Sequence, residues 1–269
     1  VLLPTTSIVP LLNEVGAERR VYLGMAALIP ALVVGGYGLL RKRGAGIWGT
    51  AIVAIASLSC GYLTFQRNHD YQSDRSIWRS VVEYRPDNPR GHNNYGKALY
   101  EAGKLVGALA HYRRAIELKP YYPEAWGNLG LALFHQGDHV GALRAYGQAL
   151  AQESRLAETW YNLGVAHHHN GDLRQALQAY NQAAELRPGD VEAWYNMGMA
   201  HRKNLNSAGA VVALTKVTKL APDFADGWFQ LGRVLRDLGE MADAAAAFEM
   251  VLVLRPGDNG ALKALRMLR

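Results

Sequence analysis

Residues 126–149 define a pattern that returns every 34 positions along this chain. In this segment Trp126, Gly130, Ala142 and Tyr146 mark four columns. One period earlier or later, the tryptophan column holds His92, Trp160, Trp194 and Trp228, the glycine column Gly96, Gly164, Gly198 and Gly232, the small column Ala108, Ala176, Ala210 and Ala244, and the large column Tyr112, Tyr180, Leu214 and Phe248. Self-similarity with a fixed period of about 20–50 residues is typical of stacked repeats that contact mainly their neighbours.

Each period contains two apolar stretches with helical spacing and a turn between them. The turn carries Gly103, Gly137, Gly171 and Gly239, but Leu205 stands there in the fourth unit. The sequence therefore predicts antiparallel helix pairs, and Leu205 leaves the geometry of the fourth turn open. Four units end on a proline, and Ser154 takes that place in the second.

Residues 89–256 resemble five tandem tetratricopeptide repeats, which implies an all-α, right-handed solenoid. The predicted repeats are 89–122, 123–156, 157–190, 191–224 and 225–258. Residues 67–88 are predicted to form half a repeat and the junction to it. Residues 259–269 are predicted to be a capping helix with Leu262, Leu265 and Leu268 on its buried side.

Two stretches without charge precede the repeats, at residues 21–40 and 44–66. At about 1.5 Å per residue, each is long enough to cross roughly 30 Å of hydrocarbon. The basic triplet 41–43 lies between them and marks a loop, because a basic residue at the bilayer centre costs about 2.5–3.5 kcal/mol. We expect a transmembrane hairpin over 21–66, preceded by an extracytoplasmic or interfacial segment at 1–20. Two buried helices of a soluble protein are the alternative.

The basic triplet also predicts the orientation, because short positively charged loops face the cytoplasm. The repeats would then lie on the periplasmic side, most simply of a bacterial inner membrane. The flank 14–20 carries two acids and two bases and opposes this assignment weakly. Since Val1 does not open a recognisable signal peptide, we expect the sequence to begin inside a longer chain or after processing.

Residues 1–100 are similar to the junction in bacterial membrane proteins that carry tetratricopeptide repeats at their C-termini. The strings AERRVYL at 17–23 and RPDNPRGHNNYG at 85–96 carry this similarity. Many of those proteins resemble polyprenol-phosphate-sugar-dependent glycosyltransferases or their eukaryotic relatives that mannosylate secreted proteins. The resemblance implies a parent enzyme of that class, but no residue here matches its catalytic acid. We predict no catalytic residue in this chain and no cofactor.

A column of side-chain amides stands two residues after the tryptophan column, at Asn94, Asn128, Asn162, Asn196 and Gln230. Asparagine is unfavourable inside a helix, so five amides in register require a reason. An amide both donates and accepts hydrogen bonds, as the backbone of an extended peptide requires. The column is similar to the asparagine ladder of O-linked N-acetylglucosamine transferases, which implies peptide binding on the concave face. The alternative is that each asparagine bonds the adjacent repeat.

One residue earlier stand Tyr161, Tyr195 and Phe229, which are predicted to anchor the partner. Packing on the next helix is the alternative for these rings. The first-turn acids Glu124, Glu158, Glu192 and Asp226 are assigned to the helix dipole instead.

Metal and nucleic-acid sites are not predicted. His167, His168 and His169 are consecutive in a helix, where successive side chains point about 100° apart and cannot close on one ion. The net charge of +6 includes the triplet 41–43, and no unbroken basic stripe follows the repeats.

The sequence thus predicts a membrane-anchored scaffold that binds a protein or extended peptide, as a subunit of a membrane complex. The alternative is the C-terminal part of an integral-membrane glycosyltransferase whose repeats recruit the acceptor protein. The sequence leaves open whether the parent protein is an enzyme.

Overall fold

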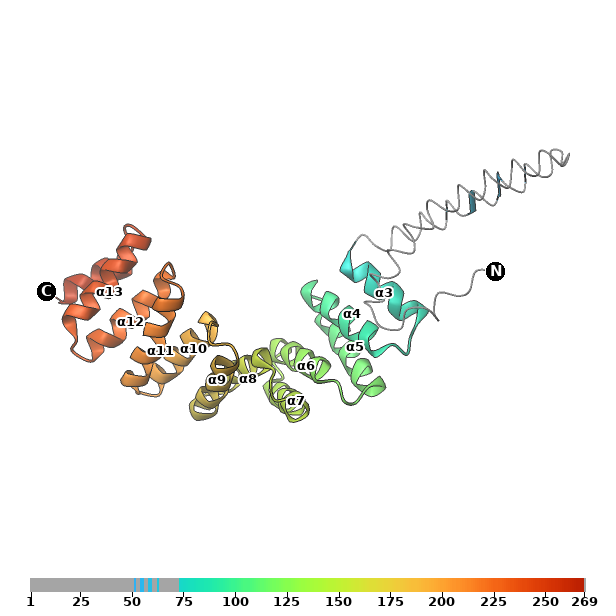
Figure 1. Ribbon diagram of the computed structural model, residues 1–269, viewed down its shortest axis with the longest axis horizontal. Coiled ribbons are helices and arrows are strands. Elements are labelled where there is room, and N and C mark those ends of the chain that lie inside the picture. Colours follow the sequence, from blue (N-terminus) through green and yellow to red (C-terminus); the bar gives the residue numbers. More distant parts are fainter. Residues whose placement is uncertain (1–50, 52–53, 56–57, 60–61, 63–72, 269) are drawn as a thin grey trace. The chain divides into compact units, whose positions relative to one another are not determined.

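The computed structural model describes residues 73–268 and, before them, six residues between 51 and 62. The predicted segments 1–20, 21–40 and 41–43 lie outside the described residues, as does most of 44–66. Within what is described, no helix combines the length and hydropathy that crossing a bilayer requires. Residues 73–268 form α3 (Asp74–Tyr84), α4 (Pro89–Glu101), α5 (Leu105–Leu118), α6 (Pro123–Gln136), α7 (His139–Gln152), α8 (Ala157–Asn170), α9 (Leu173–Leu186), α10 (Val191–Lys203), α11 (Ser207–Leu220), α12 (Ala225–Asp237), α13 (Met241–Leu254) and α14 (Asn259–Leu268) (Figure 1).

The chain divides into two compact parts between Ala98 and Leu99, inside α4. In the first part, α3 starts with a capping box: the amide of Ser76 donates to Ser73 Oγ at 3.1 Å, and the amide of Ser73 donates to Ser76 Oγ at 3.1 Å. The helix packs closely on the start of α4. A Cβ at Gly91 would lie only 2.9 Å from Val81 Cγ1, so glycine permits this approach. Both contacts lie within the first part.

The second part is a stack of antiparallel helix pairs, α6 with α7, α8 with α9, α10 with α11 and α12 with α13 (Figure 1). We call α4, α6, α8, α10 and α12 the first helices and their partners the second helices. Each second helix also contacts the first helix that follows it. The predicted all-α solenoid of tetratricopeptide type is therefore confirmed for this part of the chain.

The glycine column and the large column explain why the two helices of a pair approach closely. A Cβ at Gly130 would lie 2.6 Å from the ring of Tyr146, and one at Gly198 would lie 2.7 Å from Leu214. Since real Cβ atoms do not approach carbon this closely, only glycine accommodates the large residue at these positions. The large residue is fully buried in each pair, so the close contact between the two helices is formed by one glycine and one bulky side chain.

The tryptophan column makes a hydrogen bond that repeats along the stack. The indole N–H donates to the carbonyl six residues earlier, at 3.3 Å for Trp126, 2.8 Å for Trp160, 3.0 Å for Trp194 and 2.9 Å for Trp228. His92 replaces the indole in the first repeat and its Nε2 donates to Pro86 O at 2.9 Å. The histidine thus preserves the donor that the fold requires. The bond of Trp160 to Ser154 O shows that the proline ring itself is dispensable.

The turn between the helices of each pair requires a left-handed residue. Gly103, Gly137, Gly171 and Gly239 have φ between +71° and +90°, and Leu205 has φ +57° at the equivalent position. The fourth turn therefore keeps the geometry of the others in spite of its leucine. The side chain of Leu205 is 91% exposed, so no burial offsets the strain of this backbone conformation.

Helix α14 caps the stack, and two of the three predicted leucines, Leu265 and Leu268, pack on its core. Its buried residues are Ala261 and Ala264, and Leu265 and Leu268 pack beside them on the core of α12 and α13. Leu262, predicted on the same side, is 37% exposed, and Ala261 and Ala264 take the most buried positions instead.

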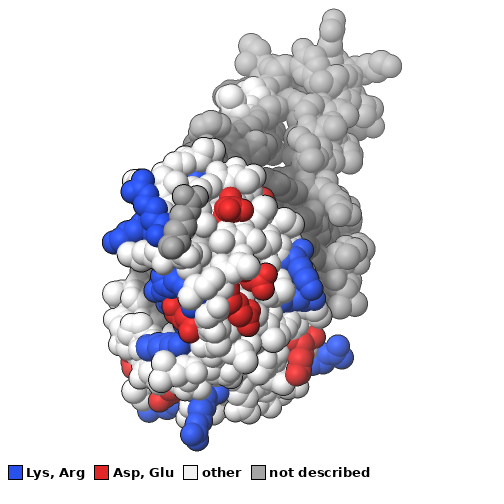
Figure 2. Space-filling view, turned by 90° about the vertical axis from the view of Figure 1, so that its left-hand side faces the viewer, with Lys and Arg blue, Asp and Glu red and all other residues white. Residues whose placement is uncertain are grey.

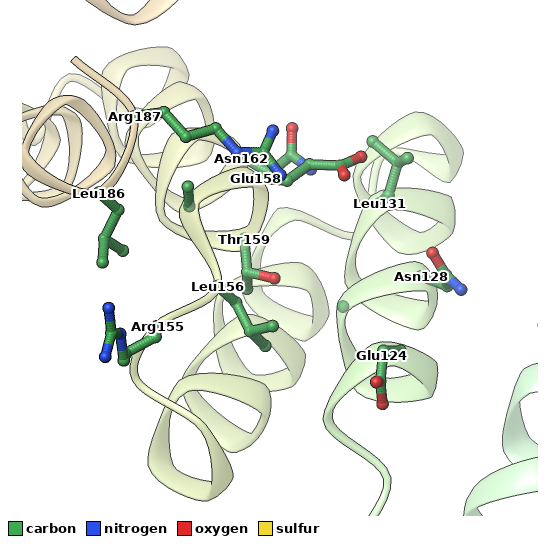
Figure 3. A pocket seen from close by; sticks show the side chains of 12 residues that line it. Glu124, Asn128, Leu131, Arg155, Leu156, Glu158, Thr159, Asn162, Leu186 and Arg187 are labelled. Atoms are coloured by element: carbon green, nitrogen blue, oxygen red, sulfur yellow. The ribbon is translucent and has the colours of Figure 1, made fainter. Parts of the chain in front are cut away.

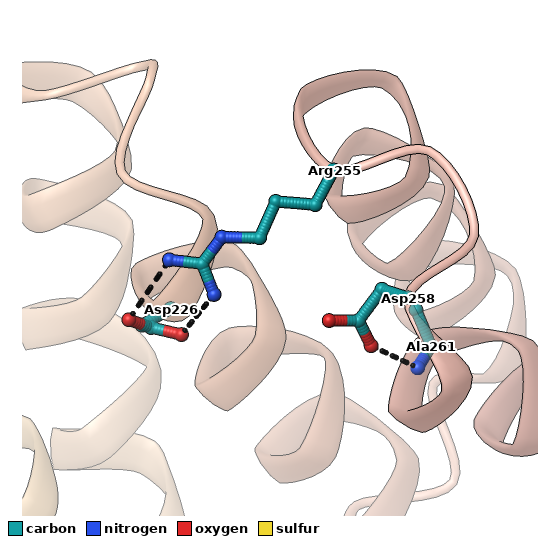
Figure 4. A network of polar contacts seen from close by, with 4 residues as sticks. All are labelled: Asp226, Arg255, Asp258 and Ala261. Atoms are coloured by element: carbon teal, nitrogen blue, oxygen red, sulfur yellow. Dashed lines mark hydrogen bonds and ion pairs between the residues drawn. The ribbon is translucent and has the colours of Figure 1, made fainter.

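Two polar contacts stabilise the connection between α13 and α14 (Figure 4). The guanidinium of Arg255 binds the carboxylate of Asp226 in a fork, with Nη1–Oδ1 at 2.8 Å and Nη2–Oδ2 at 3.2 Å. Asp258 accepts the amide of Ala261 at 2.9 Å at the start of α14. The first-turn acid of α12 thus binds the end of α13, besides its effect on the helix dipole.

Candidate functional site

The predicted amide column lies on the first helices, with Asn94 on α4, Asn128 on α6, Asn162 on α8, Asn196 on α10 and Gln230 on α12. All five side chains are half-buried. Asn94 belongs to the first part of the chain, where its Oδ1 accepts from Asn93 Nδ2 at 3.2 Å. The other four belong to the second part. We call the face of the first helices that carries the amide and aromatic columns the amide face.

Asn128 and Asn162 both line a hollow of about 350 Å³, with other side chains from α6, α8, the end of α9 and the segments that precede α8 and α10 (Figure 3). We call it the asparagine hollow. Its wall carries charges of both signs and several apolar groups. Its lining is Glu124, Gly127, Asn128, Leu131, Arg155, Leu156, Ala157, Glu158, Thr159, Asn162, Leu186 and Arg187.

Gly127 opens the asparagine hollow, because it stands where the next two repeats carry Tyr161 and Tyr195. A Cβ at this position would lie 3.1 Å from Thr159 Oγ1, so the wall opposite is also close. Thr159 itself stands where the other repeats have alanine (Ala125, Ala193) or glycine (Gly91, Gly227). One glycine and one threonine therefore distinguish this hollow from the equivalent places along the stack.

A second hollow of about 630 Å³ follows on the same face, one repeat further along. We call it the tyrosine hollow. Three predicted residues, Tyr161, Tyr195 and Asn196, line it, together with Val191, Glu192, Ala221, Asp223 and Phe224. Phe229 and Gln230 line neither of these two hollows.

The tyrosine hollow contains a hydrogen bond between repeats. Asn196 Nδ2 donates to Tyr161 Oη at 2.9 Å. Burial raises the pKa of Tyr161, as do the charges of Glu192 and Asp190 and a hydrogen bond to Glu192, whereas the bond from Asn196 lowers it. Tyr161 thus remains a neutral hydroxyl that accepts a hydrogen bond from an amide of the following repeat.

Tyr195 occupies the equivalent position one repeat later. Burial and the charge of Asp226 raise its pKa, and a hydrogen bond with Gln230 lowers it. The amide of Asn196 is therefore bonded to a tyrosine of the preceding repeat, whereas Gln230 Oε1 is buried and has no hydrogen-bond partner among the described residues.

Asn162 differs from them because Gly127 offers no hydroxyl. Within residues 73–268, no hydrogen bond joins the Asn162 side chain to another group. Its amide lines the asparagine hollow beside that of Asn128. The donor and the acceptor of this amide are therefore not used by the adjacent repeat, unlike the amide of Asn196.

The aromatic column also contributes to packing. Ring centroids lie 6.1 Å apart for Tyr161 and Tyr180, and 5.7 Å apart for Phe229 and Phe248. Tyr195 meets Phe224 edge to face at 5.4 Å. These contacts agree with the packing alternative, but Tyr161 and Tyr195 additionally line the tyrosine hollow.

Sequence reasoning did not identify the residues that the connecting segments bring to the asparagine hollow. Arg155, Leu156 and Arg187 precede α8 and α10, outside the helical columns. The available signal was a break in two columns: Gly127 precedes three aromatic residues in its column, and Thr159 stands in a column of alanine and glycine. Among the described residues, no group of three or more His, Cys, Asp or Glu is arranged to hold a metal ion.

Comparison with known proteins agrees with this repeat architecture. Tetratricopeptide repeat models match residues 96–137 and 130–171, 157–190, and 195–259. A curated relative, the protein O-mannosyl-transferase Tmtc3 of Drosophila melanogaster, is 31% identical over 115 residues. That match covers 42% of this chain and only 12% of the Drosophila protein.

Solved structures share the fold at low sequence identity. The tetratricopeptide repeat protein YrrB, described as having an unusual peptide-binding site, superposes with a TM-score of 0.62 at 22% identity over 70% of this chain and 97% of its own. MamA of Desulfovibrio magneticus RS-1 gives 0.59 at 20% identity over 64% and 97%, and PilF of Pseudomonas aeruginosa gives 0.58 at 19% over 67% and 82%. Because repeat models match more than half of the chain and the helix pairs repeat every 34 residues, this protein belongs to the tetratricopeptide repeat family.

Proposed function

We propose that this protein is a membrane-anchored scaffold that binds an extended segment of a partner protein on its amide face. The observation that carries this proposal is the amide of Asn162, which forms no hydrogen bond within residues 73–268. It lines the asparagine hollow, as Asn128 does. An amide that is half-buried and makes no bond within the fold gains a hydrogen bond when a peptide backbone enters. The similarity of the fold to a repeat protein with a peptide-binding site is consistent with this use.

The hollow suits a peptide better than a compact small molecule. It is open, and it places two amides from adjacent repeats in one row with acids and arginines around them. Each peptide–amide hydrogen bond contributes a net of about 0.5–1.5 kcal/mol, so the two amides supply modest affinity with little sequence preference. Neighbouring side chains, such as Arg155 and Arg187, would then select among partners.

Membrane attachment rests on residues 21–66. The two uncharged stretches and the basic triplet 41–43 support a hairpin with the repeats on the extracytoplasmic side. Among the described residues of the second stretch, Ile55, Leu58 and Tyr62 are helical and exposed, as expected of side chains that face lipid. Alkaline carbonate should leave the protein in the membrane pellet, and extraction into the supernatant would contradict the proposal.

A second candidate is that the chain is the C-terminal part of a membrane glycosyltransferase, whose repeats recruit the acceptor protein. The similarity to the O-mannosyl-transferase Tmtc3 favours it, although the match covers 12% of that protein. The intact mass of the protein from native membranes separates the two candidates. A mass near 29.5 kDa favours the scaffold, and a mass tens of kilodaltons greater favours the enzyme.

The peptide-binding proposal is tested with the full chain in detergent micelles. Peptides selected from a random library are measured against Asn128→Ala/Asn162→Ala and a control, Gln148→Ala/Asn181→Ala, whose amides are exposed on the second helices α7 and α9. We expect the first variant to weaken binding roughly tenfold, since two hydrogen bonds are lost, with an unchanged melting temperature. Unchanged affinity in that variant, or equal losses in both, would contradict the proposal.

A further inference from the structure

The amide face changes its chemistry along the second part of the chain. Seven residues after the aromatic column, which is nearly two helical turns, stands a further column on the same side of each first helix. From α4 to α12 it contains Tyr100, Phe134, His168, Arg202 and Arg236. The column is thus aromatic on the early helices and basic on the late ones.

Arg233 adds a third guanidinium to the late helices. It stands one helical turn before Arg236 on α12, so the two side chains share one side of that helix. Arg202 occupies the position equivalent to Arg236 on the preceding first helix, α10. All three side chains are half-buried. We call Arg202, Arg233 and Arg236 the arginine cluster.

Electrostatic effects agree with this placement. Burial lowers the pKa of Arg233, and the positive charges of Arg202 and Arg236 lower it further, while Asp237 opposes them. Arg202 also lowers the pKa of Tyr195, which lines the tyrosine hollow. The members of the cluster therefore repel one another. Arg202 stands seven residues after Tyr195 on α10, and so on the same side of that helix as a residue that lines the hollow.

Little negative charge compensates the cluster. Arg236 binds Asp237 Oδ1 with Nη2 at 2.8 Å and Nε at 3.1 Å. Over residues 73–268, neither Arg202 nor Arg233 forms an ion pair. By contrast, the more exposed Arg255 is fully engaged by Asp226. Two half-buried guanidinium groups without counter-ions are prepared to bind an external anion, because a carboxylate satisfies their forked donors.

We propose that the arginine cluster binds the carboxylates of an acidic stretch of Asp or Glu in the partner segment. This rests on the proposed function: the backbone is held by Asn128 and Asn162, and its acidic end reaches α10 and α12. The early helices offer Tyr100 and Phe134 instead, so the partner is expected to be apolar at one end and acidic at the other. The groove would thus impose a direction on the bound segment.

A continuous polyanion fits the face less well than an acidic peptide. Glu158 lines the asparagine hollow and Glu192 lines the tyrosine hollow, so a nucleic acid following the amide face would meet both carboxylates. On the face shown in Figure 2, acidic side chains also lie between the basic ones and no stripe of one sign is visible. The amide face can therefore bind negative charge at the arginine cluster but not along its whole length.

The test uses two fluorescent peptides and the full chain in detergent micelles. Both carry the same stretch of alternating Ser and Ala, followed by four Glu in one and four Gln in the other. We expect the Glu peptide to bind roughly tenfold more tightly, with an advantage that shrinks as salt screens the charges. Equal binding of the two peptides, or tighter binding of a single-stranded oligonucleotide than of the Glu peptide, would overturn the proposal.

Variants separate this site from the proposed backbone site. Arg202→Gln/Arg233→Gln should abolish the preference for Glu over Gln, while Arg144→Gln/Arg174→Gln, with the same charge change at exposed positions of α7 and α9, should keep it. Loss of the preference in both variants would refute a local site. Asn128→Ala/Asn162→Ala should weaken both peptides equally. If it weakens neither while the Glu preference persists, the backbone site fails and the arginine site stands. Thermal melts by circular dichroism verify that each variant is folded.

Discussion

Asn196 donates a hydrogen bond from Nδ2 to the hydroxyl of Tyr161 at 2.9 Å, and this bond joins one repeat to the repeat before it. An amide of the predicted ligand column thus also serves the fold. Asn162 has the same position in its own repeat but faces Gly127. The same residue type in the same register therefore has two roles, which depend on the residue that the previous repeat presents.

This difference predicts unequal effects on stability. Asn196→Ala should lower the free energy of unfolding by about 0.5–1.5 kcal/mol, because the bond to Tyr161 is lost. Asn162→Ala should change it by much less. Chemical denaturation of both variants measures the two values, and Tyr161→Phe in the Asn196→Ala background should add little further loss. Equal destabilisation by the two alanine variants would show that the bond contributes nothing.

Filling the asparagine hollow should abolish its function without unfolding the protein. Gly127→Tyr with Thr159→Ala copies the residues of the next repeat, where Tyr161 and Ala193 stand at the equivalent positions. The new hydroxyl should engage Asn162 as Tyr161 engages Asn196, so peptide affinity should fall about tenfold. Titration with a labelled peptide measures the loss. Thr159→Ala alone is the control and should bind normally; a filled hollow with normal affinity would exclude this site.

Leu205 is a site where the fold can be improved. Its φ of +57° costs an L-residue about 1–2 kcal/mol, and its exposed side chain offers no compensation. Leu205→Gly should raise the free energy of unfolding by about 0.5–1 kcal/mol, after the greater chain entropy of glycine is subtracted. The reciprocal change, Gly171→Ala, meets no atom within 4 Å and should destabilise through its backbone alone. A loss of stability in Leu205→Gly would mean that the leucine makes a stabilising contact.

Acid should destabilise the protein through two histidines. Burial lowers the pKa of His201, and burial and the charge of Lys203 lower that of His168. The unfolded chain, with histidine pKa near about 6.5, therefore binds protons before the native state does, and stability falls as the pH drops below that value. In addition, His201 Nδ1 lies 3.2 Å from Asn206 Nδ2 and accepts its hydrogen only when unprotonated. Melting temperatures measured between about pH 7 and 5 should fall less steeply for His168→Gln/His201→Gln; an identical slope would contradict this.

The repeats could be predicted from the sequence because their columns report local requirements. A glycine that faces a ring such as that of Tyr146 leaves no room for a side chain, so it recurs at every 34th position. The left-handed turn strongly favours glycine, which stands in four of the five units, with Leu205 in the other. The tryptophan recurs for an equally local reason, because its indole N–H donates a hydrogen bond to a carbonyl six residues earlier. The departures His92 and Leu205 were noticed as exceptions, but their solutions depend on atoms that only the folded chain brings together.

The candidate site was predictable only in part. Periodicity placed Asn128 and Asn162 on one face, since register along a helix follows from the sequence alone. It could not tell which amides are free, because that depends on whether the neighbouring repeat supplies Tyr161, Tyr195 or Gly127.

The sequence by itself therefore determined the repeat period, the helix pairs and the residues that share a face, because each follows from spacing along one chain segment. Only the tertiary structure decided which amides are bonded, which residues open the asparagine hollow and which face of α14 is buried. Those outcomes depend on contacts between residues about one repeat apart. Whether two such side chains meet depends on the distance and angle at which the helices pack.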